Sequence, residues 1–312
     1  MKMLTLDIGG TYSRFAYFTV DSKNEYQIID RFEFETTQNH INHFSDLLNH
    51  FTNNKPELFP EIQEYDICGI AIAGPVVKRK AYPPNISWIL NLEEQPLLPT
   101  TYLLNDFAAQ AYALLRVDVQ SSLIVVHQGN ADGDLSAVIG AGTGLGHSLI
   151  VNNQPQLIIP SEAGQCAFNF KQYEEKIEQF FLSTLKTDYI NNDQVVSGSG
   201  LSLLHQYITG TKLTATEILT NKQANEETIK YFSRFYGRAS REYCLSTCAN
   251  RELIISGGIA GKHPEIIRHT AFREEFLNSD THKALLSTLH IKLNTRPELG
   301  MLGMLEYISN IQ

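Results

Sequence analysis

Hydrophobic and polar residues alternate in the first part of the chain in a way that is typical of β-strands. In the third of three successive strand-like segments, Phe32 and Phe34 alternate with polar neighbours. Apolar residues at helical spacing follow, at positions 41, 44, 48 and 51. The pattern therefore predicts strands over 3–8, 14–20 and 26–35, then a helix, and then a further strand over 67–73.

The second part of the chain repeats this order of elements. A short strand ends at Leu104 and leads through Asn105 and Asp106 into a helix. Further strands are predicted over 123–126, 136–139, 147–151, 157–159 and 253–255, with two long helical stretches between the last two and a final helix over about 297–311. The repeat favours two α/β domains that face each other across a cleft, 1–106 with about 298–312, and 107–297. One large doubly wound sheet is the alternative, but consecutive hairpin strands favour mixed sheets.

A glycine turn between two strand-like runs occurs twice. The first is DIGGTYSR at 7–14, and the second is GAGTGLG at 140–146. Glycine has no Cβ, so its backbone N–H groups are open to an anion. A single such turn is most simply a tight hairpin. Two of them suggest two halves that close on one polyphosphate, as in a phosphotransferase.

Other glycine-rich nucleotide sites do not match the spacing. A dinucleotide fingerprint leads into a helix, whereas an apolar, strand-like run follows Gly146. The stretch from Gly257 to His263 is one residue too short for a P-loop, and His263 stands where a hydroxyl should bind magnesium. These differences argue against a dehydrogenase and against a P-loop enzyme.

Composition narrows the class of protein further. The 312 residues carry a formal net charge of -9, and 43% are hydrophobic. The acidic balance argues against non-specific binding to nucleic acid or to an anionic membrane. No apolar run approaches the length of about 20 residues that spans a bilayer. The strand pattern begins by Met3, so no signal peptide is expected. The four scattered cysteines indicate a reducing, cytoplasmic location rather than a disulfide framework.

Three acidic residues allow either a structural or a chemical interpretation. Asp106, between a strand and a helix, suits a helix N-cap, but it also suits a general base that accepts a hydroxyl proton during phosphoryl transfer. Asp7 by itself would be a turn residue that bonds its own backbone. Glu162 by itself would be a solvated surface charge. The residues alone leave these alternatives open.

Seven segments, taken together and in order, resemble the bacterial glucokinases, within the hexokinase- and actin-like superfamily. They are LDIGGTYSR (6–14), GIAIAGPV (69–76), LLNDFAAQAYAL (103–114), GAGTGLG (140–146), SEAGQCAF (161–168), VVSGSGLSLL (195–204) and ISGGIAGK (255–262). The resemblance implies two actin-like (ribonuclease H-like) α/β domains with mixed sheets that flank a central cleft. It also implies an ATP-dependent hexokinase that phosphorylates the 6-hydroxyl of glucose or a related hexose, and a homodimer.

The resemblance implies a role for individual residues as well. Asp106 corresponds to the catalytic base. Asp7 is expected to hold a hydrated Mg²⁺ through water, because magnesium keeps much of its hydration shell. The implied sugar-binding residues are Asn85, Asn105, Asp106, Glu162, Gln165 and Asp193. The implied ATP-binding residues are Gly9, Gly10 and Thr11 of the first turn, Thr143 and Gly144 of the second, and Gly257 and Gly258 near the adenosine.

Several positions depart from the family pattern. Gln165 stands where the family has His, Asp193 where it has Glu, and Ala163 where it has Gly. Tyr12 replaces the usual Asn beside the first turn, and the stretch from Gly237 to Arg241 is poorer in glycine than the family pattern. Buried ligands of sugar hydroxyls discriminate strongly, so such changes could alter which sugar fits. They motivate an alternative, a sugar-binding sensor or regulator of the same fold with reduced or lost catalysis; the retained Asp106 argues against it.

Overall fold

The structure is a computed structural model that describes residues 1–21, 25–36, 41–56, 65–94 and 100–311. Contacts between residues divide the chain into two compact units. Unit 1 consists of Met1–Ser121 and Glu298–Gln312, and unit 2 consists of Ser122–Pro297. Each unit has its own sheet and its own hydrophobic core.

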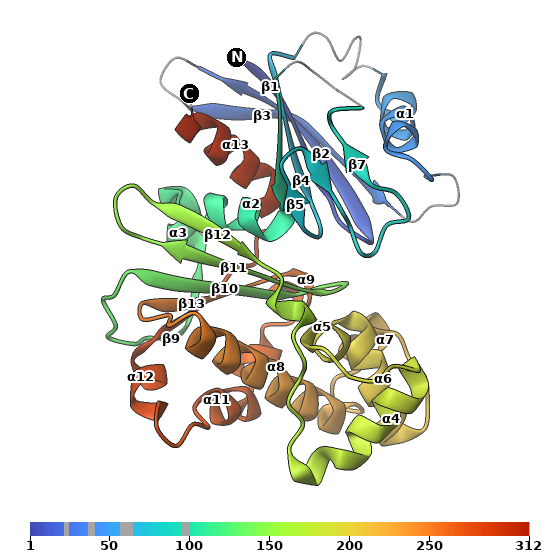
Figure 1. The fold of residues 1–312 in the computed structure, drawn as a ribbon, viewed down its shortest axis with the longest axis vertical. Helices are drawn as coiled ribbons and strands as arrows, with labels where there is room; N and C mark the ends of the chain where they lie inside the picture. The colour runs from blue at the N-terminus through green and yellow to red at the C-terminus, as the bar shows by residue number, and fades with distance from the viewer. Residues whose placement is uncertain (22–24, 37–40, 57–64, 95–99, 312) are drawn as a thin grey trace. The chain divides into compact units, whose positions relative to one another are not determined.

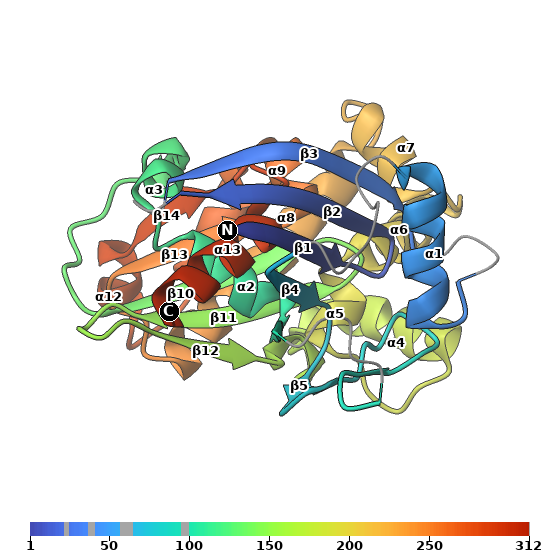
Figure 2. The same ribbon diagram turned by 90° about the horizontal axis from the view of Figure 1, so that it is seen from above.

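The main sheet of unit 1 has the strand order β3-β2-β1-β4-β8. β1 (Lys2–Ile8), β2 (Tyr12–Val20) and β3 (Tyr26–Glu35) form an antiparallel meander, side by side in Figure 2. β4 (Ile67–Ile72) and β8 (Thr101–Asn105) continue the sheet parallel to β1. The sheet is therefore mixed, as the consecutive hairpin strands predict.

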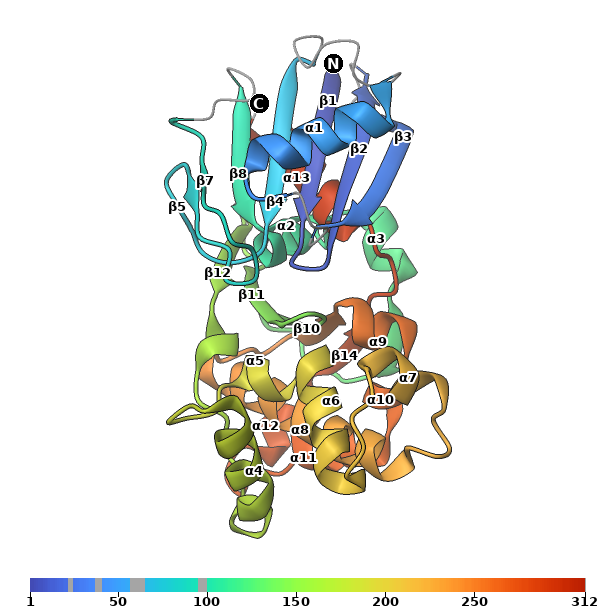
Figure 3. The ribbon, with the colours of Figure 1, turned by 90° about the vertical axis from the view of Figure 1, so that its right-hand side faces the viewer.

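Helices cover both faces of this sheet, as Figure 3 shows. α1 (Phe44–Asn54) lies on one face, where Phe44, Leu47 and Phe51 join the core beneath the strands. α2 (Asp106–Ala113) and α13 (Leu299–Ile311) pack against each other on the other face. Unit 1 also contains the short strands β5 (Val76–Val77), β6 (Lys80–Ala81) and β7 (Leu90–Asn91), and α3 (Val117–Ser122) extends one residue beyond it.

The sheet of unit 2 has the order β12-β11-β10-β13-β14-β9. β10 (Leu135–Ala141), β11 (Leu145–Val151) and β12 (Leu157–Ser161) are antiparallel, whereas β13 (Glu252–Ser256) and β14 (His290–Leu293) run parallel to β10. Strand by strand this repeats the unit 1 sheet, with β9 (Ile124–His127) added at the edge. The predicted repetition of one α/β theme is confirmed.

α8 (Glu226–Ser246) is the central helix of unit 2. Its apolar face, which includes Phe232, Phe235 and Tyr236, packs into the core beneath the sheet (Figure 1). The other helices of unit 2 are shorter, and two of them are 3₁₀ helices. They are η3 (Ala163–Gln165), η4 (Gln172–Glu174), α4 (Glu175–Leu185), α5 (Asn192–Val195), α6 (Gly198–Thr209), α7 (Ala215–Thr220), α9 (Gly258–Lys262), α10 (Glu265–Arg268), α11 (Thr270–Phe276) and α12 (Lys283–Thr288).

The stretch from Gly237 to Arg241 has a structural role in α8. The guanidinium of Arg238 is buried, with Nη1 2.6 Å from Glu174 Oε2 and Nε 3.1 Å from Glu275 Oε1. Arg241 Nη1 also reaches Glu275 Oε1, at 3.0 Å. These ion pairs tie α8 to η4 and α11. Such buried ion pairs are costly to break, because removal of one partner leaves an uncompensated buried charge.

The sequence predicts the main strands and the long helices, including the last one. It does not predict β14, the small sheet of β5, β6 and β7, or the short helices of unit 2, which span too few residues for a clear period. The expected boundary at residue 106 also differs from the division at Ser121. α2 belongs to unit 1 because Gly303 of α13 lies directly on the backbone of Ala109, with no room for a Cβ.

Candidate active site

The first glycine turn joins β1 to β2 as a tight hairpin. Strand pairing runs as far as Ile8 opposite Ser13, and the N–H of Gly9 donates to the carbonyl of Tyr12 at 3.0 Å. The carbonyl of Thr11 accepts the N–H of Thr36 at 2.8 Å. Gly9, Gly10 and Thr11 therefore lie together at the tip of one hairpin, as predicted from their pattern.

Asp7 lies at the carboxyl end of β1, just before this hairpin. Only 8% of the residue is exposed, and its Oδ2 is 3.6 Å from Nη1 of Arg14 on β2. The backbone of α13 closes the other side, since an added Cβ on Gly300 would be 2.5 Å from Cγ of Asp7. Burial raises the pKa of the Asp7 carboxyl, and the charge of Arg14 opposes that shift.

Asn105 and Asp106 lie where β8 meets α2. Asn105 is the N-cap, and its Oδ1 accepts the N–H groups of Phe107 and Ala108 at 2.9 and 3.0 Å. Asp106 is the first helical residue, and its Oδ1 accepts the N–H of Phe107 at 2.9 Å. The N-cap of α2 is thus Asn105. Asp106, for which the N-cap role was one of the two interpretations, is the next residue and lies inside the helix. Its carboxylate lies at the helix N-terminus, where the helix dipole favours negative charge.

The other amide end of Asn105 is tied to the loop that carries Asn85. Nδ2 of Asn105 donates to the carbonyl of Gly74 at 3.0 Å. Gly74 has a φ of 94°, and an added Cβ there would lie 2.7 Å from Cδ of Pro84. Asn85 is the next residue and lies exposed in a turn. Within unit 1, Asn105 is therefore hydrogen-bonded to a backbone position that packs against residues 82–84, the segment just before Asn85.

The second glycine turn joins β10 to β11. Ala141 pairs with Leu145, and the N–H of Gly142 donates to the carbonyl of Gly144 at 2.8 Å across the turn. The carbonyl of Gly142 accepts the N–H of Gly198, the first residue of α6, at 2.9 Å. Thr143 is exposed at the tip. This hairpin is the counterpart of the first one in strand order and position.

Gly257 and Gly258 follow β13, which pairs with β10 beside this hairpin. Gly257 has a φ of 85°, a conformation that favours glycine, and an added Cβ would lie 2.5 Å from the carbonyl oxygen of Ala141. Gly258 begins α9, and an added Cβ there would have no other residue's atom within 4 Å outside its own chain neighbours and helix backbone. Within unit 2 the structure therefore brings Thr143, Gly144, Gly257 and Gly258 to one end of the sheet.

The remaining predicted residues of unit 2 also gather there. Asp193 Oδ1 accepts the N–H of Leu145 at 2.6 Å. Gln165 Oε1 accepts Nδ2 of Asn191, two residues from Asp193, at 3.0 Å. The N–H of Gln165 donates to the carbonyl of Glu162 at 2.9 Å. Glu162, Gln165 and Asp193 thus form one hydrogen-bonded cluster with the second hairpin.

This cluster concentrates negative charge. Partial removal from solvent raises the pKa of the Glu162 carboxyl, and the neighbouring charge of Asp193 raises it further. Burial also raises the pKa of Asp193, although the N–H of Leu145 opposes that shift. His147, buried behind the hairpin, has its pKa lowered to about 3 by burial and is therefore neutral.

Among the described residues, no group of three or more His, Cys, Asp or Glu side chains could hold a metal ion. A single buried carboxylate such as Asp7 does fit the chemistry of magnesium, which binds through few protein oxygens, substrate phosphates and retained water. Asp7 could therefore hold the ion only together with water and a bound polyphosphate. Within the same described part of the chain, no helix has the length and apolar character needed to cross a bilayer.

Sequence reasoning missed several residues that shape the site. Gly300 lies against Asp7, and Arg14 pairs with it, although Arg14 stands inside the first glycine motif. In unit 2, Asn191 and Asn192 hold the segment around Gln165; Nδ2 of Asn192 donates to the carbonyl of Cys166 at 3.1 Å. The sequence contains a signal for one of these contacts: Arg14 follows Asp7 by seven residues and lies on the other strand of the same predicted hairpin.

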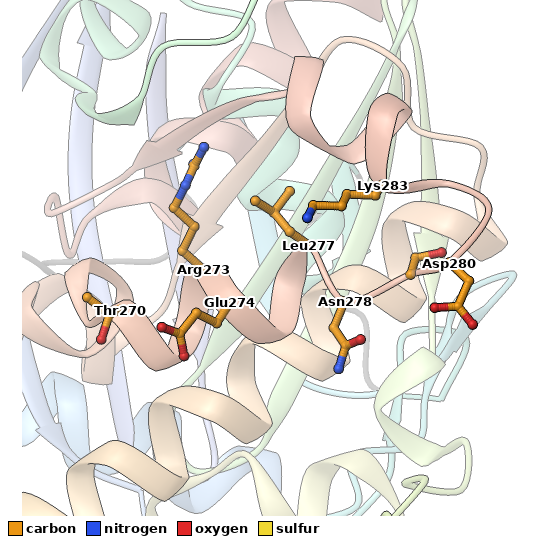
Figure 4. A pocket seen from close by; sticks show the side chains of 8 residues that line it. Thr270, Arg273, Glu274, Leu277, Asn278, Asp280 and Lys283 are labelled. Carbon is orange, nitrogen blue, oxygen red and sulfur yellow. The ribbon is translucent and has the colours of Figure 1, made fainter.

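A separate hollow of about 700 Å³ lies elsewhere in unit 2. It is lined by α11 and the segment that leads to α12, and Figure 4 shows Lys283 reaching toward Leu277 there. Arg273 and Lys283 contribute positive charge, and Glu274 and Asp280 contribute negative charge. None of the predicted site residues lines this hollow, so it is not the site described above.

Comparison with known proteins identifies the family. The family model described as "Glucokinase" matches residues 4–311. The chain belongs to the glucokinase family. It is therefore a sugar kinase, an enzyme that transfers a phosphoryl group to an alcohol acceptor.

Relatives and solved structures agree with this assignment. A glucokinase of Nostoc punctiforme is 27% identical over 294 residues, which cover 80% of this chain and 86% of that protein. The glucokinase of Balamuthia mandrillaris in complex with glucose has a TM-score of 0.82 at 18% identity, with 99% of this chain and 93% of that chain covered. A ROK family glucokinase of Streptomyces griseus, in complex with glucose and AMPPNP, has a TM-score of 0.66 at 16% identity over 98% and 99% of the chains. At such identities the structures show a shared fold, the actin-like α/β fold of this glucokinase-family member.

Proposed function

We propose that this glucokinase-family protein transfers the γ-phosphoryl group of ATP to the 6-hydroxyl of glucose or a related hexose, with Asp106 as the general base. The observation that carries the proposal is the division of labour between Asn105 and Asp106. Asn105 takes the N-cap role, so Asp106 is not needed as the cap of α2. A carboxylate at this position can accept the hydroxyl proton as the bond to phosphorus forms.

The two hairpins are the proposed phosphate-binding elements. Gly9, Gly10 and Thr11 would contact ATP from unit 1, and Thr143 and Gly144 from unit 2, with Gly257 and Gly258 near the adenosine. Backbone N–H groups that are already in place stabilise the charge of a transferring phosphoryl group without reorganisation. The Streptomyces griseus relative was solved with AMPPNP, which supports ATP as the donor.

The proposed sugar-binding residues are Asn85, Asn105, Asp106, Glu162, Gln165 and Asp193. A sugar presents hydroxyl groups that both donate and accept, and amides and carboxylates match them. Gln165 keeps its Nε2 end as a donor while Oε1 accepts from Asn191. One Nδ2 proton of Asn105 is used by Gly74, so this residue would offer a sugar hydroxyl a single donor.

Magnesium is proposed to be held by Asp7 through water. When bound, it would supply positive charge to the phosphates of ATP. The residues around Asp7 orient its carboxylate; Arg14 contacts Oδ2, and Gly300 leaves just enough space beside Cγ. We also propose a cytoplasmic homodimer with no nucleic-acid or membrane partner, which rests on the family resemblance and on the net charge of -9.

The substitution Asp106→Asn tests the proposal directly. It keeps size and hydrogen bonding but removes the proton acceptor, so we expect kcat to fall by about 10²–10⁴-fold with sugar binding retained. Phosphorylation is measured by a coupled assay with ATP, magnesium and a panel of hexoses, and sugar binding by calorimetry. Asp132→Asn, the same change at an exposed position, is the matched control.

Two outcomes would contradict the proposal. If Asp106→Asn keeps most of its turnover at saturating ATP and sugar, Asp106 serves only the helix terminus. If the parent protein binds a hexose but phosphorylates none of the panel, a sugar-binding sensor replaces the kinase. The departures at Gln165 and Asp193 are the observation that favours this second candidate.

A further inference from the structure

The Asp193 carboxylate is attached to the backbone of the second hairpin. Oδ1 of Asp193 accepts the N–H of Leu145 at 2.6 Å, across a sequence separation of 48 residues. The same oxygen lies against Cα of Gly144, so that a Cβ on Gly144 would collide with it. A hydrogen bond to an ionised acceptor is about twice as strong as one between neutral groups. This contact therefore helps to fix the position of the hairpin, together with the bond from the N–H of Gly198 to the carbonyl of Gly142.

Asp193 is itself held in place by its neighbours. It lies in α5, whose N-cap is Asn191, and the side chain of Asn191 accepts the N–H of Gln194 at 2.8 Å. The side-chain Nδ2 of Asn192 donates to the carbonyl of Cys166, and the backbone N–H of Asn192 donates to the same carbonyl at 2.9 Å. α5 is thereby locked to the segment that carries Glu162 and Gln165. A shift of this segment can reach the hairpin through Asp193, in addition to the direct packing of Gly164 against the carbonyl of Leu145.

We infer that Asp193 is a positioning residue of the phosphate-binding hairpin, which couples the segment of Glu162 and Gln165 to the place where the nucleotide phosphates bind. The inference rests on the proposed function for the roles of these segments. It assigns to Asp193 an effect on nucleotide binding beyond any contact with sugar. Oδ2, the other carboxylate oxygen, can still meet a sugar hydroxyl, so the two roles are compatible.

The coupling rests on the close fit of the Asp193 side chain against Gly144. The side chain of Asp193 fills the space beside Gly144, and Gly144 is not in the left-handed region of φ. Alanine is therefore tolerated by the backbone at 144, and only the Asp193 carboxylate obstructs its Cβ. Gly144→Ala should push this carboxylate away and break its bond to Leu145. It should mimic the loss of Asp193 itself.

A double-mutant cycle between Gly144→Ala and Asp193→Ala tests the inference. Binding of a non-hydrolysable ATP analogue with magnesium is measured by calorimetry without sugar, and free energies of unfolding are measured in urea. Each single variant should weaken nucleotide binding by about tenfold, the effect of one lost charge-assisted hydrogen bond. In the double variant the second substitution should add little, because the obstructing oxygen is already gone.

Two further variants separate positioning from packing. Asp193→Asn keeps an oxygen that can accept the N–H of Leu145, so it should recover most of the nucleotide affinity lost in Asp193→Ala. Asp188→Ala removes an exposed carboxylate that lies five residues away and should leave nucleotide affinity unchanged. If the alanine variants fail to fold, Asp193→Asn and the KM values for ATP and sugar still decide the question.

The inference is overturned if Asp193→Ala raises the KM for sugar but leaves nucleotide affinity unchanged, or if the effects of Gly144→Ala and Asp193→Ala simply add. It is also overturned if Asp193→Asn loses as much nucleotide affinity as Asp193→Ala. Failure of the proposed function looks different. In that case the parent phosphorylates no sugar, while the coupling between positions 144 and 193 in the urea measurements is still present.

Discussion

The two glycine hairpins of this protein are alike in strand order but are held in different ways. Each joins the first two strands of an antiparallel meander, and the first strand of each meander also pairs in parallel with the strand after the meander. In unit 1 the carboxylate beside the hairpin, Asp7, comes from the hairpin strand itself and faces the cation of Arg14. In unit 2 the carboxylate is Asp193, which comes from a distant helix and lies near a second carboxylate, that of Glu162.

The two hairpins are therefore kept rigid by different kinds of contact. A hairpin that binds an anion must be rigid, because its N–H groups stabilise charge only if they are already in position. Unit 1 gains rigidity from a local ion pair and from close packing of α13 at Gly300. Unit 2 gains it from long-range hydrogen bonds through Asp193 and Gly198. We therefore expect substitutions at the first hairpin to act by changing charge and packing around Asp7. Those at the second should act by displacing the hairpin backbone.

Among substitutions at or beside the two hairpins, the largest effect is expected for Asp7→Asn. This change keeps the shape of the side chain but removes the charge that would hold hydrated magnesium and that pairs with Arg14. We expect kcat to fall by about 10²-fold or more, with little change in sugar binding, because the charge of the transferring phosphoryl group is then less stabilised. Steady-state kinetics over a range of magnesium concentrations measures the effect.

Glu33→Gln is the matched control for Asp7→Asn. Glu33 is the other partner of Arg14, with Oε2 2.5 Å from Nε, and its side chain is 49% exposed. If Asp7 acted only by orienting Arg14, the two substitutions would reduce kcat to a similar degree. A large loss in Asp7→Asn alone would assign the effect to the Asp7 carboxylate.

An intermediate effect is expected for Gly300→Ala in α13. Helix propensity by itself predicts a gain of up to about 1 kcal/mol in the free energy of unfolding, since alanine favours helices over glycine. The added Cβ would lie 2.5 Å from Cγ of the buried Asp7, and overpacking costs about 1–3 kcal/mol. We expect the second effect to dominate, so that the variant is less stable in urea and weaker with magnesium-ATP.

Ser309→Ala in the same helix provides the comparison, because it changes propensity without meeting Asp7. A Gly300→Ala variant as stable as the parent would show that α13 can move away from β1. The contrast between the two hairpins would then rest on the ion pair alone.

The smallest effect is a shift in pH dependence at the second hairpin. The charge of Asp193 helps to raise the pKa of Glu162, so Asp193→Asn should lower that pKa. A carboxyl with a raised folded-state pKa stabilises the fold at low pH, and this stability is lost as the pH rises through that pKa. As the pH rises above about 4, the ordinary pKa of a glutamate carboxyl, stability should therefore fall less steeply in Asp193→Asn than in the parent. The substitution also removes the raised pKa of Asp193 itself, which acts in the same direction.

Urea unfolding at a series of pH values measures this slope. The acid limb of kcat/KM for sugar should move to lower pH in the same variant. An unchanged acid limb would mean that the charge of Asp193 does not affect the pKa of Glu162. The contrast between a carboxylate beside a cation at the first hairpin and two neighbouring carboxylates at the second would then be wrong.

Much of the fold follows from local patterns in the sequence. Alternation at Phe32 and Phe34 and helical spacing around Phe44 and Phe51 predict elements that the structure contains. The repeated order of strands and glycine turns predicts the two similar sheets. β14 and α5 were not predicted, because four residues are too few to display a period of either kind.

The candidate site could be assembled from the sequence only as a set of separate residues. The resemblance of the whole set of motifs singles out Asp7, Asp106 and the two glycine turns, because each of them by itself also fits a turn, a helix cap or a tight hairpin. The motifs do not show that Asn105, rather than Asp106, caps α2, since both residue types are good N-caps. That distinction depends on which residue has extended backbone and which has entered the helix.

The sequence therefore determines the local chemistry of this protein: the two hairpins, the carboxylates beside them, and the strands that carry both. Periodicity and glycine act over a few residues, so they can be recognised without knowledge of the fold. Only the tertiary structure decides the long-range contacts, such as Gly300 against Asp7 and Asp193 on the backbone of Leu145. These contacts join residues 293 and 48 positions apart. They arise from how sheets and helices pack together, and no local pattern encodes which partner will be there.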